Sequence, residues 1–447
     1  MNIKNLWEEI MGNRKKQFSR FGITPADILI PKPSYDLAKW AVVACDQYTS
    51  EPEYWQRVSD FVGKEPSCFK ITFPECYLEN NDKEERITNI NSTMREYLKA
   101  DIFNTFKDCF VLVARTTETG TRYGLMATLD LERYSYDKDS KTNIRATEGT
   151  ILSRIPPRKE IRKNAPLELP HIMVLISDKY RAIIEPLAKK REKLKKLYDV
   201  PLMENGGRVE GYLVDSDSDF SALSQGFETL YKELDPANPL LFAMGDGNHS
   251  LATAKNCWED IKKGLTAEEI ETHPARYSLV EIENIFDPAL QFEPIHRVFF
   301  NTNLEVMLNK ISALVKTVKT EEVENLTSLT KKINQVVADK QSFGLVHNGK
   351  FIAVTIPNLV SSTAAGTIQK IIDSLTEEEG IKVDYIHGAE VTVKLSTNEN
   401  VGIILPEVSK DTFFASIIKD RAFPRKTFSI GHAHEKRYYL EARKIIK

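Results

Sequence analysis

No stretch of this 447-residue chain is both long and uncharged enough to cross a membrane. A membrane helix needs about 18 or more consecutive, mostly apolar residues, and every apolar run here is shorter. The first twenty residues, Met1–Arg20, mix charged side chains with too short an apolar run for a signal peptide. We therefore expect a cytoplasmic protein with no membrane partner.

Cysteine is scarce, and the spacing of the cysteines in the sequence forms no paired motif. The chain has five cysteines, an odd number, and none forms a C-x-x-C pair. They are Cys45, Cys68, Cys76, Cys109 and Cys257. This usage predicts reduced thiols. No group of His, Cys and carboxylate residues has the spacing of a zinc site, which disfavours a tightly held transition metal.

Excess charge of either sign is missing too. Lys and Arg number 61 and Asp and Glu 64, for a formal net charge of −3. Bulk electrostatics therefore give no attraction to nucleic acid, and any anion site must be local. The sequence also contains no Walker-type loop and no G-x-G-x-x-G loop, which disfavours a standard nucleotide-binding fold.

The length predicts two or three domains or closely joined lobes. Strand and helix patterns alternate between residues 165 and 300, which is typical of an α/β core. We expect an N-terminal α+β lobe at 1–160, the α/β core at 161–300 and a C-terminal α+β lobe at 301–447. The sequence does not predict the oligomeric state.

Apolar periodicity and turn residues predict the local elements. Helices are expected at Pro52–Val62, Asp82–Lys99, Tyr180–Tyr198 and Phe220–Leu234; a strand is expected at Lys39–Cys45, and hairpins at 110–129 and 343–355.

The most informative stretch is Leu240–Lys255. An apolar run with the length of a buried strand turns at Gly245–Gly247 and continues as a helical pattern. Asp246 and His249 then lie at a strand-to-helix junction, where the helix offers N–H groups and the positive end of its dipole to a phosphate. The same residues are also compatible with a turn and a helix N-cap that bind no ligand.

Residues 145–162 concentrate arginine. The four arginines are Arg145, Arg154, Arg158 and Arg162, and Glu148 accompanies them. Guanidinium groups bind phosphate oxygens through two parallel hydrogen bonds, so the cluster is a candidate anion clamp. A solvated basic face would have the same composition.

Two further stretches carry candidates. Phe423–Arg437 supplies many donors, among them Arg425, Lys426 and Thr427, although a solvated loop has the same composition. Asp46, Gln47 and Tyr48 follow an apolar strand pattern and are candidates for substrate binding; alternatively, Asp46 caps the next helix. His296, beside Arg297, fits either a structural or a binding role.

Four separated segments together resemble a known family. They are Trp40–Pro52, Arg145–Glu148, Gly245–His249 and Pro424–Phe428. The combination is similar to a large, mostly uncharacterised family of prokaryotic-type proteins of unknown function. Some of its members resemble free L-serine kinases that use inorganic pyrophosphate as phosphoryl donor.

The turn also resembles that of the smaller free serine kinases with a ParB/sulfiredoxin-like fold, which typically reads Asp-Gly-His-His-Arg. Asp246, Gly247 and His249 match this pattern, whereas Asn248 and Ser250 depart from it. The missing arginine fits a small donor such as pyrophosphate better than an adenine nucleotide. The resemblance implies a ParB/sulfiredoxin-like kinase core flanked by the two lobes.

The hypothesis is therefore a kinase that phosphorylates free L-serine from pyrophosphate with Mg²⁺. Phosphoryl transfer needs positioning, charge neutralisation and a proton acceptor. Asp246 is the expected base or Mg²⁺ ligand, with Glu148 as rival base. His249, Gly247 and Asn248 are expected to hold the transferred phosphate. The donor's remaining charge is assigned to Arg145, Arg154, Arg158, Arg425, Lys426 and Thr427.

Other functions use the same groups. An ATP- or ADP-dependent kinase of serine or another small hydroxylated metabolite would share nearly every feature. A ParB-like nucleotide-binding switch would bind without transfer, and a phosphohydrolase would use water as acceptor. L-serine and pyrophosphate rest on the resemblance.

Overall fold

The computed structural model describes residues 14–315, 317–335, 337, 339–357, 360–375 and 381–446. The chain divides into two compact units. Unit 1 comprises Met1–Leu290 and His432–Lys447, and unit 2 comprises Gln291–Gly431. Each unit is built on its own sheet, so the mixed α/β class expected from the sequence is confirmed.

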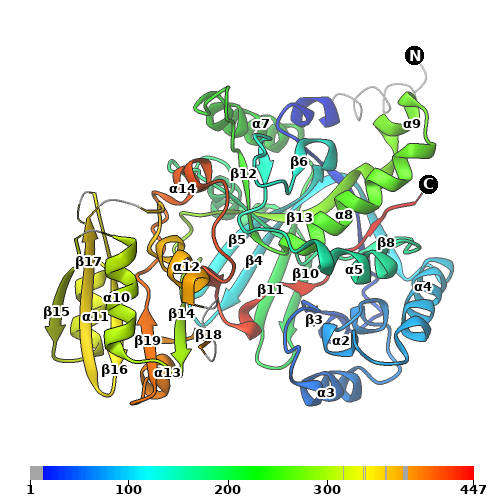
Figure 1. The fold of residues 1–447 in the computed structure, drawn as a ribbon. Helices are drawn as coiled ribbons and strands as arrows, with labels where there is room; N and C mark the ends of the chain where they lie inside the picture. The colour runs from blue at the N-terminus through cyan, green and yellow to red at the C-terminus, as the bar shows by residue number, and fades with distance from the viewer. Residues whose placement is uncertain are drawn as a thin grey trace. The chain divides into compact units, whose positions relative to one another are not determined.

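An eleven-stranded sheet organises unit 1 (Figure 1). Its strand order is β10 (Lys195–Leu202), β11 (Gly207–Val214), β4 (Phe103–Thr117), β5 (Gly120–Asp130), β13 (Tyr277–Asn284), β9 (Met173–Ile176), β12 (Phe242–Asp246), β7 (Ile144–Arg145) and β6 (Tyr134–Ser135). β1 (Ile23–Thr24) pairs with β5, and β2 (Ala26–Pro31) pairs with β4. The centre is mixed, because β13 runs parallel to β9 while β9 runs antiparallel to β12.

The two faces of this sheet carry separate cores, because successive side chains of a strand point to opposite faces. In β13, Leu279 belongs to the first core, whereas Val280 and Ile282 belong to the second. The first core also contains residues of α2 (Leu37–Trp40), α3 (Pro52–Val62) and α4 (Lys83–Lys99). The second contains residues of α6 (Glu185–Lys189), α7 (Asp217–Lys232) and α8 (Asn248–Ile261).

The last residues of the chain return to unit 1. β21 (Tyr438–Tyr439) pairs with β3 (Val42–Val43), and β22 (Arg443–Lys444) pairs with β8 (Leu167–Glu168). Tyr438, Tyr439 and Leu440 are buried in the first core. The C-terminal segment is therefore an integral part of unit 1, and it brings basic side chains to the middle of the sheet.

Unit 2 contains a seven-stranded sheet with its own helices. The order is β15 (Lys319–Val323), β17 (Lys350–Pro357), β16 (Lys340–His347), β19 (Asn400–Ile404), β14 (Phe292–Phe300) and β18 (Lys382–His387), and β20 (Phe428–Ile430) also pairs with β14. The helices are α10 (Leu304–Leu314), α11 (Leu326–Ile333), α12 (Ala364–Leu375), α13 (Ala389–Leu395) and α14 (Phe413–Asp420). Between residue 303 and about residue 380 the sequence predicts mainly helices with the hairpin at 343–355; the hairpin is present as β16 and β17, whereas β15 is a strand that was not predicted.

Several local predictions match the structure. Helices are present at the ranges predicted for α3, α4 and α7, within a few residues, and the hairpin predicted at 110–129 is β4 with β5. The strand predicted at Lys39–Cys45 is only partly present. Asp36 caps α2, so the segment begins as a helical turn, and within it β3 covers Val42–Val43.

The helix predicted at Tyr180–Tyr198 is wrong. Only α6 and a short 3₁₀ turn form there, and the chain then enters β10. β10 pairs with β11 over Lys195–Leu202, with Tyr198 and Val200 buried. Tertiary pairing therefore overrides the local helical pattern.

The compact units differ from the three lobes expected from the sequence. The predicted lobes 1–160 and 161–300 share one sheet, because β4 and β5 pair with β11 and β13. Most of the third lobe forms unit 2, apart from the C-terminal segment.

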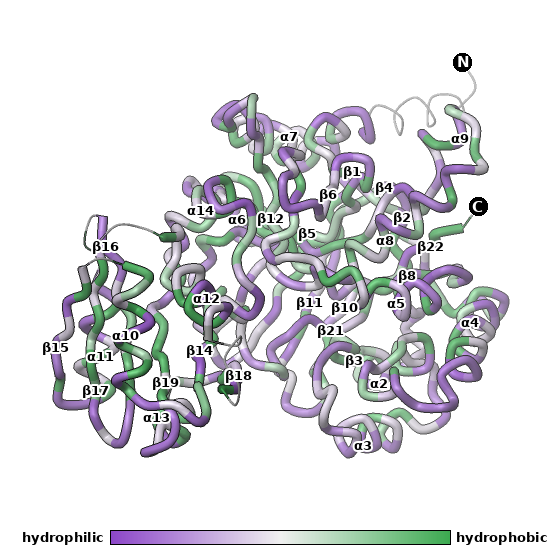
Figure 2. The backbone as a smooth tube through the Cα atoms, viewed as in Figure 1, coloured by the Kyte–Doolittle hydropathy of each residue, from purple (hydrophilic) through white to green (hydrophobic). Residues whose placement is uncertain are grey.

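Polar residues interrupt the hydrophobic colouring along the helices in Figure 2. Among the helices that the structure describes, none is long and apolar enough to span a membrane. Residues 1–13, which begin the segment examined for a signal peptide, lie outside the described residues.

Candidate functional site

The stretch that stood out in the sequence forms the expected strand-to-helix junction. β12 ends at Asp246, and α8 begins at Asn248. Gly247 is the N-cap residue, with φ of 77° and ψ of 28°, in the left-handed region. A Cβ atom at Gly247 would lie 3.1 Å from the Cα of Ile172. Glycine is therefore favoured by conformation, and a Cβ atom would crowd the Ile172 backbone; as the N-cap residue, Gly247 has no side chain to cap the helix.

Asp246 is held as a carboxylate at this junction. Its Oδ1 accepts a hydrogen bond from the Gly247 N–H (2.8 Å), and its Oδ2 accepts one from Lys436 Nζ (3.0 Å). Burial raises the pKa of Asp246, but the Lys436 ammonium outweighs burial, so the pKa is lower than usual. The side chain remains 25% exposed. An ionised carboxylate is therefore within reach of a ligand, although its low pKa makes it a weak base.

The segment 147–151 lies against the start of α8. The Thr147 N–H donates to Asn248 Oδ1 (3.2 Å), and the Ile151 N–H donates to His249 Nε2 (3.3 Å). Because its Nε2 accepts, His249 is assigned as the Nδ1–H form. Glu148 lies in this segment and is half-buried. The structure thus brings the rival base close to the turn.

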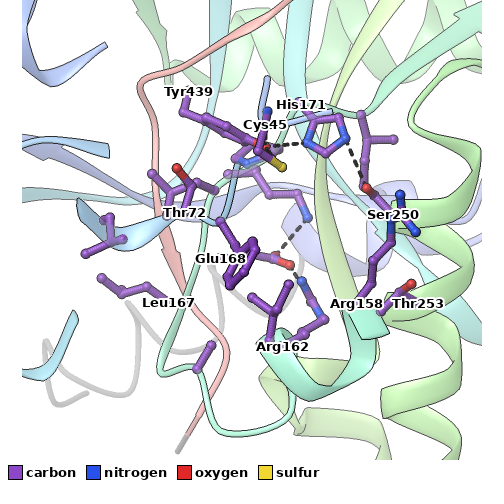
Figure 3. A pocket seen from close by; sticks show the side chains of 18 of the residues that line it. Cys45, Thr72, Arg158, Arg162, Leu167, Glu168, His171, Ser250, Thr253 and Tyr439 are labelled. Atoms are coloured by element: carbon purple, nitrogen blue, oxygen red, sulfur yellow. Dashed lines mark hydrogen bonds and ion pairs between the residues drawn. The ribbon is translucent and has the colours of Figure 1, made fainter. Parts of the chain in front are cut away.

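His171 joins the same helix to the C-terminal segment (Figure 3). Its Nε2 lies 3.0 Å from Ser250 Oγ, and its Nδ1 lies 2.8 Å from the Tyr439 hydroxyl. Tyr439 also donates to Cys45 Sγ (3.0 Å), and Asp46 Oδ2 lies 3.7 Å from His171 Nε2. In a Ser-His-Asp triad the carboxylate holds the other ring nitrogen, so this arrangement is not such a triad.

A family described as "Protein of unknown function (DUF1015)" matches residues 26–376. The chain belongs to this family. No curated protein is similar enough in sequence to count as a match.

Solved structures with distant similarity include a free serine kinase variant in complex with AMP. It has a TM-score of 0.38 and 10% identity, covering 72% of this chain and 92% of that one. A conserved hypothetical protein from Pyrococcus furiosus has a TM-score of 0.33 and 11% identity, covering 70% and 90%. A C-terminal truncation of SbnI from Staphylococcus aureus has a TM-score of 0.33 and 8% identity, covering 68% and 82%. Similarity at this level carries no argument about function.

The predicted arginine clamp is dispersed in this DUF1015 chain. Arg145 is buried and donates to the carbonyls of Ser140 (3.2 Å) and Pro239 (2.9 Å), and burial lowers its pKa. Its guanidinium thus supports the backbone, and we leave it out of the proposed site. Arg154 is exposed, and its carbonyl accepts from Arg158 (2.9 Å).

Arg158 remains near the site through a different contact. It forms an ion pair with Glu75, whose pKa is raised by burial despite that arginine. The Glu75 N–H donates to the Cys45 carbonyl (2.8 Å), so this pair is tied to the strand end that carries Asp46. Arg158 is thus connected to the predicted substrate-binding segment.

The predicted substrate-binding residues separate into two groups. Asp46 approaches His171, and Gln47 Nε2 donates to Asp46 Oδ1 (3.0 Å). Tyr48 has φ of 51° and stacks on Tyr54, with ring centroids 3.8 Å apart. Asp46 and Gln47 therefore belong to the candidate site, whereas the Tyr48 ring packs on α3.

The remaining candidates belong to unit 2. Thr427 is buried and donates to the Pro424 carbonyl (2.7 Å), and Lys426 Nζ lies 5.1 Å from the ring centre of Tyr385. His296 Nδ1 accepts from the Leu405 N–H (3.1 Å), and burial lowers its pKa to about 4. His296 thus has a structural contact. The phosphate-binding role of Lys426, Thr427 and Arg425 stays a prediction.

Sequence reasoning missed four residues that complete the site: Lys436, His171, Ser250 and Tyr439. Ser250 follows the predicted turn residues directly, and His171 begins an apolar run, His171–Ile176, that has the length of a buried strand, so both could have been noticed. Lys436 and Tyr439 lie in a basic segment without periodicity. Their place depends on strand pairing with β3, which no local pattern indicates.

The carboxylates offer limited metal ligation. Among the described residues, no group of three or more His, Cys, Asp or Glu side chains is placed to hold a metal ion. Mg²⁺ commonly binds through one or two carboxylates together with waters and phosphate oxygens. Asp246 fits that mode, because it is ionised and partly exposed.

Proposed function

We propose that the chain is a small-molecule kinase that transfers a phosphoryl group from inorganic pyrophosphate to the hydroxyl of free L-serine, giving O-phospho-L-serine. The observation that carries the proposal is the ionised Asp246, paired with Lys436 at a helix start whose N-cap residue is glycine. A cation, a carboxylate and a helix N-terminus at one point are the groups that phosphoryl transfer needs. Donor and acceptor follow the family resemblance described above.

In this proposal the phosphates of the donor lie at the start of α8. The N–H groups there and the Lys436 ammonium neutralise charge on the transferred group. Asn248 and His249 fix the turn through their contacts with Thr147 and Ile151. The positions of the phosphate-binding groups are therefore set before the donor arrives.

The proton acceptor and the metal ligand are divided between two carboxylates. Asp246 holds Mg²⁺, since its low pKa suits a permanent charge better than proton transfer. Glu148, in the adjoining segment, accepts the proton of the serine hydroxyl. Mg²⁺ would neutralise charge on the phosphate oxygens when bound. Asp46 and Gln47 are assigned to the acceptor side, next to His171.

Phosphorus NMR of the purified chain tests the proposal. The protein is incubated with Mg²⁺ and L-serine, and pyrophosphate, ATP or ADP is supplied in separate tubes. We expect a phosphoserine signal with pyrophosphate. A phosphoserine signal with ATP or ADP, but none with pyrophosphate, would show that the nucleotide is the donor. Orthophosphate without phosphoserine would indicate a phosphohydrolase.

Two variants separate the site from general damage. Asp246→Asn should abolish the phosphoserine signal. Asp260→Asn changes a carboxylate near the other end of α8, where it pairs with Lys159 and Lys263 on the surface, and should leave the signal unchanged. Equal loss in both variants would contradict a specific role for Asp246.

A further inference from the structure

A cavity of about 150 Å³ lies in unit 1 beside His171 and Ser250 (Figure 3). One part of its wall is apolar and includes Ile71, Phe73 and Ala165, all buried in the first core. Ion-paired side chains line another part. A pocket with an apolar wall and a few convergent polar groups is the usual form of a small-molecule site.

The charged wall consists of two ion pairs. Glu75 pairs with Arg158, and Glu168 pairs with Arg162 (2.5 Å); all four residues line the cavity. Glu168 also accepts from Arg443 Nε (2.8 Å), behind the wall. Within the wall the two pairs balance in charge, because the third guanidinium, that of Arg443, lies behind it. A ligand with one negative charge is therefore favoured by the hydrogen-bond donors that the wall leaves, and not by its net charge.

Arg158 can supply the hydrogen bonds for such a ligand. Its two terminal nitrogens donate to Glu75 and to the Arg154 carbonyl. A guanidinium carries five N–H donors in a planar fork, so these two contacts leave donors for a ligand carboxylate. A carboxylate matches that fork in shape.

The volume limits the rest of the ligand. An apolar cavity of about 150 Å³ accommodates a molecule of the size of benzene. The apolar part of the wall suits a hydrocarbon body of about six carbon atoms, and hydroxyl groups of Thr72, Thr253 and Ser278 line other parts of the cavity.

We propose that this cavity binds a small monocarboxylate with an apolar body of about six carbon atoms, its carboxylate on Arg158 and its body against Ile71, Phe73 and Ala165. Simple carboxylic acids and apolar α-amino acids share this chemistry. An amino acid would additionally place its ammonium near Glu75. The cavity shares His171, Ser250 and Tyr439 with the candidate site, but the proposed binding does not depend on phosphoryl transfer.

Calorimetric titration of the full chain tests the proposal without any activity assay. The probes are hexanoate, L-norleucine, hexylamine and L-serine. Hexylamine has a hydrocarbon chain one carbon longer than that of hexanoate and reverses the charge. Tighter binding of L-norleucine than of hexanoate would assign the site to amino acids, and the reverse order to simple acids; both orders support the proposal.

Three variants locate the binding. Ala165→Leu fills the apolar wall, and Arg158→Gln removes the carboxylate partner. Lys163→Gln is the matched control, because Lys163 is an exposed residue at the end of α5 (Ile155–Arg162). We expect the first two variants to weaken binding of the acid at least about tenfold, and the control to match the wild type.

Several results would overturn the proposal: no binding of either acid at millimolar concentration, equal binding of hexylamine, or unchanged binding in Arg158→Gln. Preferential binding of L-serine would overturn it as well, and would assign the cavity to a hydroxylated acceptor. If Ala165→Leu does not fold, as judged by circular dichroism, Arg158→Gln and the hexylamine comparison still decide the question.

Discussion

The ion pair between Lys436 and Asp246 is expected to stabilise unit 1 by an amount that depends on pH. Lys436→Met removes the ammonium and leaves Asp246 with the Gly247 N–H as its remaining hydrogen-bond donor among those described above. Breaking a fully buried pair costs about 3–5 kcal/mol. Here the two side chains are 10% and 25% exposed, so we expect a loss of about 1–3 kcal/mol at neutral pH.

The pH dependence follows from the sign of the shift. In the native protein the pKa of Asp246 is lowered, so its contribution to stability is present above the unfolded pKa of about 3.9 and is lost as pH falls through the folded value. Without Lys436, burial becomes the dominant effect and raises the pKa. The stability difference between wild type and variant should therefore widen as pH rises from about 4 to 7.

Urea unfolding followed by tryptophan fluorescence measures this difference. All four tryptophans of the chain, at positions 7, 40, 55 and 258, precede residue 291, so the signal reports on unit 1. A double-mutant cycle with Asp246→Asn isolates the pair. Lys263→Met, at an exposed pair with Asp260, is the control and should change stability by less than about 0.5 kcal/mol. A coupling energy near zero, or a difference that does not vary with pH, would refute the reasoning.

Three further predictions concern single positions. Asp246→Asn removes the proposed Mg²⁺ ligand and should lower the initial rate of phosphoserine formation at least ~10²-fold; a rate near that of wild type would remove Asp246 from the mechanism. Gly247→Ala should cost about 1–2 kcal/mol in urea unfolding, because φ is positive and Ile172 is close; an unchanged midpoint would contradict this. Burial raises the pKa of Glu283 to about 8 despite the ion pair with Arg122. The contribution of Glu283 to stability is therefore fully present below its unfolded pKa of about 4.3, and it is lost as pH rises from there through the folded value of about 8. Glu283→Gln should therefore lose less stability than wild type as pH rises from about 4 to 8, and parallel pH profiles would disprove it.

Local chemistry explains which parts of the fold could be predicted. Ser216 caps α7 through the Asp219 N–H, and Pro52 occupies the first turn of α3, so both helices carry their start signals in adjacent residues. The Asp246 turn is of the same kind. An apolar strand, a glycine with positive φ and a helix follow one another within one short segment, and the sequence alone indicated all three.

Non-local contacts explain the failure at residues 180–198. Tyr198 is buried, and its hydroxyl donates to Glu441, which is 243 residues away in sequence. Neighbouring Gly211 on β11 provides the space for that ring, since a Cβ atom there would overlap it. A helical charge pattern carries none of this information, so strand pairing decided the local structure.

The C-terminal segment shows the same limit at the site itself. The composition of Phe423–Arg437 predicted a basic loop for phosphate, and assigned the task to Arg425, Lys426 and Thr427. Within unit 1, the cation that reaches Asp246 is Lys436, 190 residues away in sequence. Its position is fixed by the neighbouring Arg437, which donates to the Pro170 carbonyl (3.0 Å) and pairs with Glu281 and Glu441. Because removal of one partner from a buried charge network leaves the others uncompensated, the placement of Lys436 depends on a network that no sequence motif contains.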